Sequence, residues 1–379
     1  MDSILSYLRA REPELIALIG ELVECESPSD DPAAVARFVE LVADTVAREA
    51  LVHILPGDPF GPHLQCAFDL PGGEKDGQVL VLGHSDTVHP LGSLAGMPFR
   101  EADGRLWGPG VLDMKAGIAF TIFAVRALRE LDLPVRRNVV LQLNSDEEVG
   151  SESSRPLTEA EARRSVAVLL VEPGTGLEGK VKTARKGVAE YTLLVRGKAA
   201  HAGLDFASGA SAILELARQI ETIAGFTDPE RGITVNPGVI AGGTRTNVVA
   251  AEARASIDAR VLRLRDAAAL DRKFHRLRPM DKRCRIEVSG GLNHPPMERS
   301  PGVVRLFRLA QRLARELDLE LEESLSGGGS DGNFTAALGV PTLDGLGAVG
   351  EGAHAPGESI LVSRMADRAA LIAKLVHAL

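Results

Sequence analysis

Residues 78–87 read Gln-Val-Leu-Val-Leu-Gly-His-Ser-Asp-Thr. Every position from 79 to 82 is apolar, and the run ends at Gly83 and the polar His84. A strand that is apolar at every position is typical of a sheet buried on both faces, because one-sided strands alternate apolar and polar residues. This stretch therefore predicts a central strand that ends at a histidine.

The residues around this strand alternate between helical and strand-like patterns. Helices are predicted where apolar residues recur at helical spacing, and strands where short apolar runs lie between turn residues. The predicted helices cover residues 3–23, 33–50, 115–131 and 301–317. The predicted strands cover residues 51–55, 64–70, 78–83, 139–143 and 166–171. This alternation indicates an α/β domain with a mostly parallel central sheet flanked by helices.

The pattern changes near Lys186. Strands are predicted at 188–195, 251–261 and 285–288, and helices at 210–223 and 267–277, without the continuous apolar runs of a buried parallel sheet. The alternating segment 251–261 favours an edge strand. A chain of 379 residues is expected to form two domains. We predict a discontinuous first domain at 1–185 and 297–379, interrupted by an inserted α+β domain at 186–296.

The composition is that of a globular protein, with 45% hydrophobic and 25% charged residues. The formal net charge is -9, and no cluster of Lys and Arg offsets it, which argues against nucleic acid as the main partner. Asp2 stands where a secretory signal peptide carries positive charge, and the most apolar helical stretch, 118–128, is too short to span a bilayer. We expect a cytoplasmic protein with no membrane partner. The cysteines predict free thiols: Cys25, Cys66 and Cys284.

The strand at 78–83 is followed closely by His84 and Asp86. Ligands bind at the carboxyl ends of strands in α/β sheets. A histidine there can bind a metal while a nearby carboxylate accepts a hydrogen bond from its second ring nitrogen. A histidine after a strand more often has a structural role, so this pair alone does not define a site.

Acidic residues follow other predicted elements. Asp113 ends a glycine-rich sequence before a helix, where it could cap the helix or bridge two cations. Residues 146–148 are Asp-Glu-Glu directly after a strand, and their mutual repulsion would be relieved by exposure to solvent or by a pair of metal ions. With metals present, one of Glu147 and Glu148 would bind metal and the other would accept a proton from the activated water.

Two further candidates lie in loops. Glu172 follows the strand at 166–171, and His354 lies in a turn rich in glycine and alanine. With the earlier residues they make a set of two histidines and three carboxylates. Zinc binds such nitrogen and oxygen ligands, and two-metal sites often share a carboxylate. We predict two divalent metal ions, zinc in the first place, with cobalt or manganese as alternatives.

The order of these residues resembles that of the M20 metallopeptidases, and it is most similar to their glutamate carboxypeptidase branch. The resemblance extends over nearly the whole chain and includes residues 197–203 (GKAAHAG) and 327–332 (GGGSDG). Five ligand positions in the family's order make it specific. One departure is Ala116, where the family often has glycine, but it replaces no ligand.

The resemblance implies how five residues would divide two metals. Asp113 would bridge both ions. His84 and Glu172 would complete the protein ligands of one ion, and Glu148 and His354 would complete those of the other. A cis peptide after the bridging residue, here Asp113-Met114, is also common in the family.

The resemblance further implies the catalytic roles. Glu147 would be the general base, and Asp86 would orient His84. His201, in the inserted domain, would donate a hydrogen bond to the oxyanion in the active site of the partner subunit. That role implies a homodimer formed through the inserted domain, which would also act as a lid.

Substrate recognition is implied as well. Arg260 matches the position that binds the substrate carboxylate, and a guanidinium suits that geometry. Asn247 matches a further polar contact, and Gly328 and Gly329 would let the backbone approach the ligand. A solvent-exposed strand position is the alternative for Arg260.

Two functions from different classes follow. The first is a metallohydrolase that cleaves an amide or peptide bond next to a free carboxylate, as a carboxypeptidase or N-acyl-amino-acid amidohydrolase. Its substrate would be a small peptide or N-acyl amino acid, and a dipeptidase or a deacylase of another substrate class remains an alternative. The second is a non-catalytic, metal-dependent binding or scaffold protein on the same fold.

Overall fold

The computed structural model describes residues 2–379 and divides into two compact units. Unit 1 comprises residues 2–184, 299–325 and 330–379, and unit 2 comprises Arg185–Glu298 and Ser326–Gly329. The predicted boundaries after residues 185 and 296 lie within two residues of these divisions. The sequence did not predict that the loop at Ser326–Gly329 groups with unit 2. It does so because its backbone bonds to the first residues of that unit, where Lys186 N–H donates to the carbonyl of Ser326.

The strand β3 (Gln78–His84) is buried at every position. Val79 and Val81 pack into the large core of unit 1, whereas Leu80 and Leu82 pack into a smaller core on the opposite face. Because side chains alternate between the faces of a strand, the run 79–82 must be apolar throughout when both faces are covered.

The central sheet of unit 1, taken over the described residues, has six strands in the order β1-β2-β6-β3-β7-β14. β3 is parallel to both β6 and β7, and β14 is parallel to β7. β2 is antiparallel to both of its neighbours, β1 and β6. The predicted fold class, a mostly parallel sheet flanked by helices, is confirmed. The other strands are β1 (Ala50–Leu55), β2 (His63–Phe68), β6 (Asn138–Asn144), β7 (Ser165–Leu170) and β14 (Thr342–Leu343).

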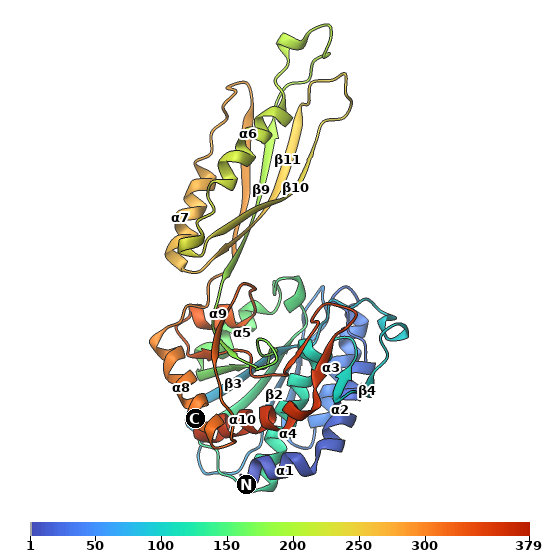
Figure 1. The fold of residues 1–379 in the computed structure, drawn as a ribbon, viewed down its shortest axis with the longest axis vertical. Helices are drawn as coiled ribbons and strands as arrows, with labels where there is room; N and C mark the ends of the chain where they lie inside the picture. Colours follow the sequence, from blue (N-terminus) through green and yellow to red (C-terminus); the bar gives the residue numbers. More distant parts are fainter. Residues whose placement is uncertain (1) are drawn as a thin grey trace. The chain divides into compact units, whose positions relative to one another are not determined.

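Helices cover both faces of this sheet. The large core joins one face to helices that include α4 and α10, which lie side by side (Figure 1). The smaller core joins the other face to α5, with Leu338 at the end of α9 packed against it. The helices of unit 1 are α1 (Ser3–Ala10), α2 (Glu12–Glu24), α3 (Pro32–Val46), α4 (Ala116–Glu130), α5 (Arg155–Arg163), α8 (Pro301–Arg315), α9 (Gly332–Ala337) and α10 (Met365–Ala378).

The prediction of one helix over residues 3–23 was wrong. The structure has two helices, α1 and α2, separated at Arg11, whose backbone is not helical. Pro13 lies in the first turn of α2. Proline is tolerated there because N–H groups in the first turn of a helix have no carbonyl acceptor within the helix, so a missing N–H group costs no hydrogen bond. The apolar spacing continues across the break, so periodicity alone did not reveal it.

Two small sheets complete unit 1, and neither was predicted. One has the order β15-β16-β5-β4 and the other pairs β13 with β8. Short strands of two to five residues carry too little periodicity to be recognised. Their bounds are β4 (Arg100–Ala102), β5 (Arg105–Trp107), β15 (Gly350–Glu351), β16 (Ser359–Leu361), β8 (Val181–Arg185) and β13 (Glu323–Ser326).

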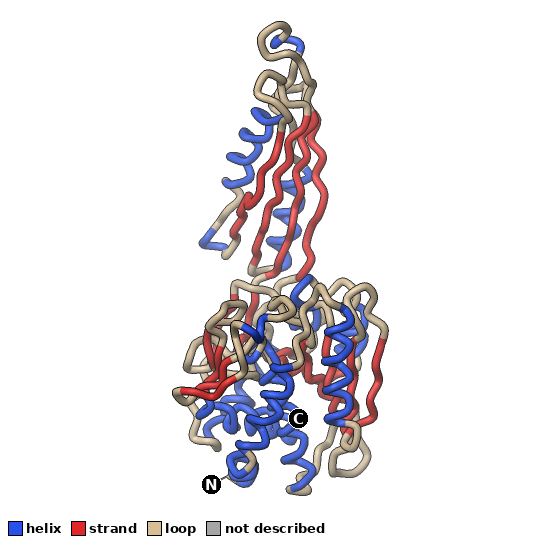
Figure 2. The backbone as a smooth tube through the Cα atoms, turned by 90° about the vertical axis from the view of Figure 1, so that its right-hand side faces the viewer, coloured by secondary structure: helices blue, strands red, loops and turns tan. Residues whose placement is uncertain are grey.

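Unit 2 is a four-stranded antiparallel sheet, β10-β11-β9-β12, with both helices packed on one face (Figure 2). Its core includes a stack of Tyr191 on Phe274, whose ring centroids are 3.8 Å apart. The separate α+β module that the sequence predicted is confirmed, and the structure adds that its sheet is antiparallel. Its elements are β9 (Gly187–Arg196), α6 (Ala212–Ala224), β10 (Thr234–Gly242), β11 (Glu252–Val261), α7 (Leu264–His275) and β12 (Arg285–His294).

The expectation that 251–261 forms an edge strand was wrong. β11 lies between β10 and β9, and the edge strands are β12 and β10, the latter containing Pro237 and a register shift. The alternation in β11 arises because helices cover only one face of the sheet, and that pattern is the same for interior and edge strands. Within residues 2–379, none of the helices combines the length and apolar character needed to cross a bilayer.

Candidate active site

Three neighbouring parallel strands carry candidate residues at their carboxyl ends. His84 is the last residue of β3, Glu147 follows β6 in the turn η3 (Glu147–Val149), and Glu172 follows β7. β6, β3 and β7 are adjacent and parallel, so these ends meet at one edge of the sheet. The residues come from distant parts of the sequence and are brought together by strand pairing.

Two loops supply the remaining candidates. Asp113 lies in the turn η2 (Val111–Lys115) between β5 and α4. This turn begins directly after Gly110, whose φ of 71° favours glycine. His354 lies in the loop between β15 and β16 and has a φ of 62°. The Asp113-Met114 peptide is cis, as the resemblance to the family suggested.

The predicted metal ligands form two groups that share Asp113. In the first, His84 Nε2 lies 3.2 Å from Asp113 Oδ1 and 3.8 Å from Glu172 Oε1. In the second, His354 Nε2 lies 3.2 Å from Asp113 Oδ2 and 3.1 Å from Glu148 Oε1. Within each group the donor atoms lie within 4.8 Å of one another. One carboxylate thus offers one oxygen to each group, which is the arrangement of a two-metal site.

The donor set fits a pair of divalent cations. Each group holds one imidazole nitrogen and carboxylate oxygens, which suit zinc and similar ions. Glu148 Oε1 is buried and makes no hydrogen bond within residues 2–379, and its charged neighbour is the imidazole of His354, whose Nε2 lies 3.1 Å away, so either a protonated His354 or a metal ion would satisfy it. A buried carboxylate oxygen without a hydrogen-bond donor is costly unless a cation satisfies it.

The two histidines respond to the surrounding carboxylates. Burial opposes a charge on His84, but its contacts with Asp113 and Asp86 outweigh burial and raise the pKa of His84 well above its usual value. Contacts with Asp113 and Glu148 raise the pKa of His354 to about 10. Without a metal, the neighbouring carboxylates therefore favour the protonated, positively charged form of both rings.

The carboxylates have opposite shifts. Burial would raise the pKa of Asp113, but hydrogen bonds from His354 and His84 hold it well below its usual range. Burial raises the pKa of Glu147 well above its usual value, and the nearby carboxylate of Glu172 adds to this. Glu147 belongs to neither donor group in the described residues. It is a glutamate with a high proton affinity beside two groups that can hold cations.

Asp86 differs in its contacts from the prediction. His84 Nδ1 bonds to the backbone carbonyl of Asp86 at 2.8 Å, and the nearer carboxylate oxygen is 3.6 Å away. The carboxylate instead accepts the N–H groups of Glu147 and Glu148, both at 3.2 Å, and the hydroxyl of Ser29 at 2.7 Å. A residue two positions after a strand end can turn its carbonyl toward the strand's last side chain, so the side chain is available for the neighbouring turn.

His201 and Asn247 lie together in unit 2. His201 pairs with Val248, and the carbonyl of Asn247 accepts the N–H of Ala202 at 2.9 Å. Both residues are exposed. His201 Nδ1 accepts the N–H groups of Gly203 and Leu204, at 3.1 and 3.0 Å. The neutral ring therefore carries its proton on Nε2, where it can donate to a ligand.

Arg260, also in unit 2, is half-buried and already paired. Its guanidinium contacts both carboxylate oxygens of Asp258, two residues before it on β11, at 2.7 to 3.0 Å. A substrate carboxylate would compete with Asp258 for the guanidinium of Arg260.

The carbonyls of Gly328 and Gly329 accept from Arg185 at 3.3 and 2.9 Å. Gly329 has a local reason to be glycine, because a Cβ there would lie 2.9 Å from the side chain of Val188. The substrate-binding roles of Asn247, Arg260 and both glycines remain predictions.

Sequence reasoning missed three buried groups near the ligands. Asp331 bonds to Asn144 and Ser151, both at 2.5 Å, and so joins the two ends of the turn that carries Glu147; burial raises the pKa of Asp331 to about 6. His63 accepts the N–H of Ser145 at 3.1 Å in the same turn. The third is Glu358. The available signals were weak, because Asp331 was noted only as part of a glycine-rich motif and Glu358 only follows His354 by four residues.

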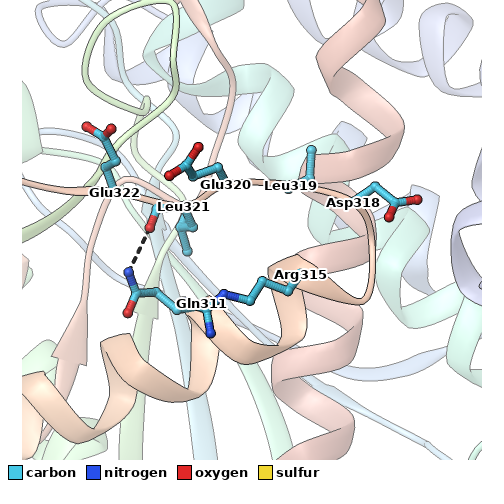
Figure 3. Close-up of a pocket in the computed structure, with 7 residues that line it drawn as sticks. All are labelled: Gln311, Arg315, Asp318, Leu319, Glu320, Leu321 and Glu322. Carbon is cyan, nitrogen blue, oxygen red and sulfur yellow. Dashed lines mark hydrogen bonds between the residues drawn. The ribbon is translucent and has the colours of Figure 1, made fainter.

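A separate pocket of about 390 Å³ opens beside α8 (Figure 3). It contains none of the predicted site residues, and a hydrogen bond of 2.9 Å from Gln311 to the carbonyl of Leu321 crosses it. Its charged groups are carboxylates and one arginine at the surface. We assign no function to it. It is lined by Gln311, Arg315, Asp318, Leu319, Glu320, Leu321 and Glu322.

Comparison with known proteins finds relatives by sequence and the same fold among solved structures. Carboxypeptidase G2 of Pseudomonas sp. (strain RS-16) is 27% identical over 378 residues, which cover 96% of this chain and 89% of that protein. The aminopeptidase PepT of Bacillus cereus ATCC 10987 has the same fold, with a TM-score of 0.77, 24% identity and coverage of 97% and 98%. So has Bacillus subtilis YXEP, a dinuclear metal binding peptidase of the M20 family, with a TM-score of 0.68, 14% identity and coverage of 98% for both chains.

The family model extends over most of the site. It matches residues 80–378, which include every predicted metal ligand from His84 to His354. With the two donor groups that share Asp113, this chain belongs to peptidase family M20/M25/M40 and is an M20-type metallohydrolase.

Proposed function

We propose that this chain hydrolyses an amide or peptide bond next to a free carboxylate, with Glu147 as the general base and two divalent metal ions as cofactors. One observation carries the proposal. Asp113 offers one oxygen to each of two donor groups, and Glu147 is close to both groups but is a member of neither. Glu147 and Glu148 are neighbours in one turn, so the division of roles between them follows from which side chain meets His354.

The metal-binding residues would be His84 and Glu172 for one ion, Glu148 and His354 for the other, and Asp113 for both. When bound, two such cations lower the pKa of a shared water toward about 7 and polarise the scissile carbonyl. Zinc is proposed first, and the same donor set accepts cobalt and manganese.

The residues of the chain account for the movement of protons. Glu147 takes one proton from the attacking water while the oxygen of that water bonds to the carbonyl carbon. It then gives that proton to the amide nitrogen as the C–N bond breaks, which yields a carboxylic acid and an amine. The second proton of the attacking water passes from this acid to the amine, so that a carboxylate and an ammonium group leave. The high pKa of Glu147 supports this transfer, although bound cations would lower it.

Groups in unit 2 would complete the site. His201 Nε2–H is the proposed oxyanion donor, supported by the two backbone N–H groups that occupy Nδ1. Arg260 is proposed to bind the substrate carboxylate in place of Asp258. Asn247, Gly328 and Gly329 are proposed as further contacts with the substrate.

We propose that the chain forms a homodimer through unit 2, which would bring His201 to the partner's site. The edge strand β10 supports this, because its Val239 and Ile240 are 61% and 59% exposed and its outer backbone groups have no neighbouring strand in the sheet. An exposed apolar edge strand is a natural site for pairing with a second chain.

The substrate class within this family is the finer part of the proposal. Carboxypeptidase G2 is, by name, a carboxypeptidase, and this chain resembles it over nearly its full length. We therefore propose a peptide or an N-acyl amino acid with a free α-carboxylate. Dipeptides and substrates of other deacylases are the alternatives.

The test is the Glu147→Gln variant in a screen of N-acyl amino acids and dipeptides with added Zn²⁺, Co²⁺ or Mn²⁺. We expect it to bind two metals like the wild-type chain and to lose at least about 10²–10⁴-fold in kcat, because the base is removed and the ligands remain. Glu152→Gln is the matched control, since Glu152 is an exposed acid in the same loop.

Activity that survives in Glu147→Gln would refute the mechanism. A wild-type chain that binds metals and hydrolyses no member of the screen would instead favour the binding-protein alternative.

A further inference from the structure

Glu358 is a buried carboxylate in the loop that carries His354. Its side chain is 1% exposed, and it lies immediately before β16. Oε1 accepts the N–H groups of Leu112 and Asp113, at 2.8 and 2.9 Å. Oε2 accepts the N–H of Gly110 at 2.9 Å and contacts His89 Nε2 at 2.7 Å. Each oxygen therefore has two partners, and the group has no capacity left to act as a base or as a metal ligand.

Most of its partners lie in the segment that holds another metal ligand, Asp113. Leu112 and Asp113 lie in the turn η2 and Gly110 directly precedes it, and the N–H groups of all three converge on one carboxylate. The backbone joins the same two segments, because the Gly108 N–H donates to the carbonyl of Glu358 at 3.3 Å. Asp113 takes its position from this turn, so the orientation of its side chain depends on the acceptor that holds it.

His89 extends the connection to a third segment. It lies five residues after His84, in the loop that follows β3, and its side chain is largely buried. The start of that loop is held by backbone bonds, since Thr87 N–H donates to the carbonyl of Ser27 at 2.8 Å. The carboxylate thus lies where the segments bearing His84, Asp113 and His354 meet.

We propose that Glu358 is a positioning residue that holds Asp113 between the two metal positions by linking these three segments. The inference rests on the proposed two-metal function and deepens it. Partners of metal ligands commonly act in this way, and their loss lowers metal affinity by about 10–100-fold. Because Asp113 is shared, loss of Glu358 should weaken both metal positions together.

The experiment compares metal affinity in Glu358→Ala and Glu358→Gln, using Zn²⁺ or Co²⁺ in competition with a chromogenic chelator. Glu358→Ala removes all four interactions and should weaken both ions about 10–100-fold. Glu358→Gln keeps one oxygen for Leu112 and Asp113 and turns an NH₂ group toward Gly110 and His89. Its loss should therefore be clearly smaller than that of Glu358→Ala.

Glu215→Gln is the matched control. Glu215 is also fully buried and also accepts two backbone N–H groups, those of Met280 and Asp281, but it lies in unit 2. The same substitution there should lower the melting temperature of the metal-free protein and leave both metal affinities unchanged. This comparison separates positioning of the metal ligands from a general loss of stability.

Wild-type affinity for both metals in a folded Glu358→Ala protein would overturn the proposal. So would an equal loss of affinity in Glu215→Gln. If Glu358→Ala does not fold, Glu358→Gln decides: weaker binding with a native circular dichroism spectrum supports the proposal, and wild-type binding refutes it. A wild-type chain that does not bind two metals would contradict the proposed function itself, so the two failures can be told apart.

Discussion

At the scale of single residues, the candidate site is a set of acids and histidines whose proton affinities depend on one another. Asp113 lies between His84 and His354, and each histidine gains proton affinity from it. A metal that binds either group must replace a proton. Metal binding and pH are therefore linked at these two side chains.

The first prediction concerns this linkage. Binding of two metals at pH 7 should release up to about two protons, one each from His84 and His354. As the pH rises toward 10, the apparent affinity should increase by up to about tenfold per pH unit for each protonated histidine, because fewer protons compete. Calorimetry in buffers of different ionisation enthalpy measures the number released.

The variant His354→Gln should release one proton fewer than the wild-type chain. The metal-free protein has the opposite dependence on pH: the raised pKa of His354 stabilises the fold below about pH 6.5, and this contribution is lost as the pH rises toward 10. Binding without proton release at pH 7 would contradict the assignment.

The second prediction concerns Asp86. Its carboxylate holds the N–H groups of Glu147 and Glu148, while its backbone carbonyl holds His84. Asp86→Ala should therefore lower kcat by about 10–100-fold and reduce metal affinity less, because the carbonyl remains in place. Kinetics and metal titration on the same preparation measure the two effects.

Ser29→Ala is the control for this variant, since it removes one hydrogen bond to Asp86 and leaves the carboxylate. A loss of metal affinity larger than the loss of kcat in Asp86→Ala would favour direct orientation of His84 by the side chain.

At the scale of secondary structure, the site depends on how closely α4 approaches the sheet. Gly117 lies in the first turn of α4, and a Cβ there would collide with the carbonyl oxygen of Val171, directly before Glu172. No side chain fits between the helix and this strand end. The glycine thus lets α4, which begins just after Asp113, pack against the segment that carries another ligand.

The third prediction follows from this contact. Gly117→Ala should lower the free energy of unfolding by about 1–3 kcal/mol, because overpacking displaces the helix or the strand end. Denaturant unfolding measures it. Gly73→Ala, where no atom lies within 4 Å of the added Cβ, should stay within about 0.5 kcal/mol of the wild-type chain. Equal stability of the two variants would contradict this description of the contact.

At the scale of the whole molecule, two units with separate cores divide the work. Unit 1 holds the proposed metal ligands and base, and unit 2 holds His201 and Arg260. The proposed dimer would join them in trans. The cytoplasmic location expected from the sequence remains a prediction.

The fourth prediction tests sharing of the site. Co-expression of His201→Ala and Glu147→Gln chains should restore activity to about a quarter of the wild-type level, since half of the dimers are mixed and each has one complete site. Activity is measured on the purified mixture, with each single variant as its control. No recovery in proven mixed dimers would contradict a site shared between subunits.

Much of this fold follows from local patterns. The continuous apolar run at 79–82 predicted β3 and a sheet covered on both faces, because side-chain alternation is a property of any strand. The candidates at strand ends could be identified because parallel strands place their carboxyl ends at one edge. The helix break at Arg11 could not be predicted, because the helical spacing of apolar residues continues across it. The short strands could not be predicted, because they contain too few residues to show a periodic pattern.

The surroundings of Glu147 separate what the sequence determines from what the tertiary structure decides. The sequence by itself determined the set of ligand types, their order and their place after strands, since these depend on neighbouring residues. Only the tertiary structure decided that β11 is interior, that Asp86 binds the turn of Glu147, and that Glu358 holds Asp113 across 245 residues of sequence. Such contacts depend on which strands and loops become neighbours, and backbone N–H groups, which every residue except proline carries, leave no pattern in the sequence.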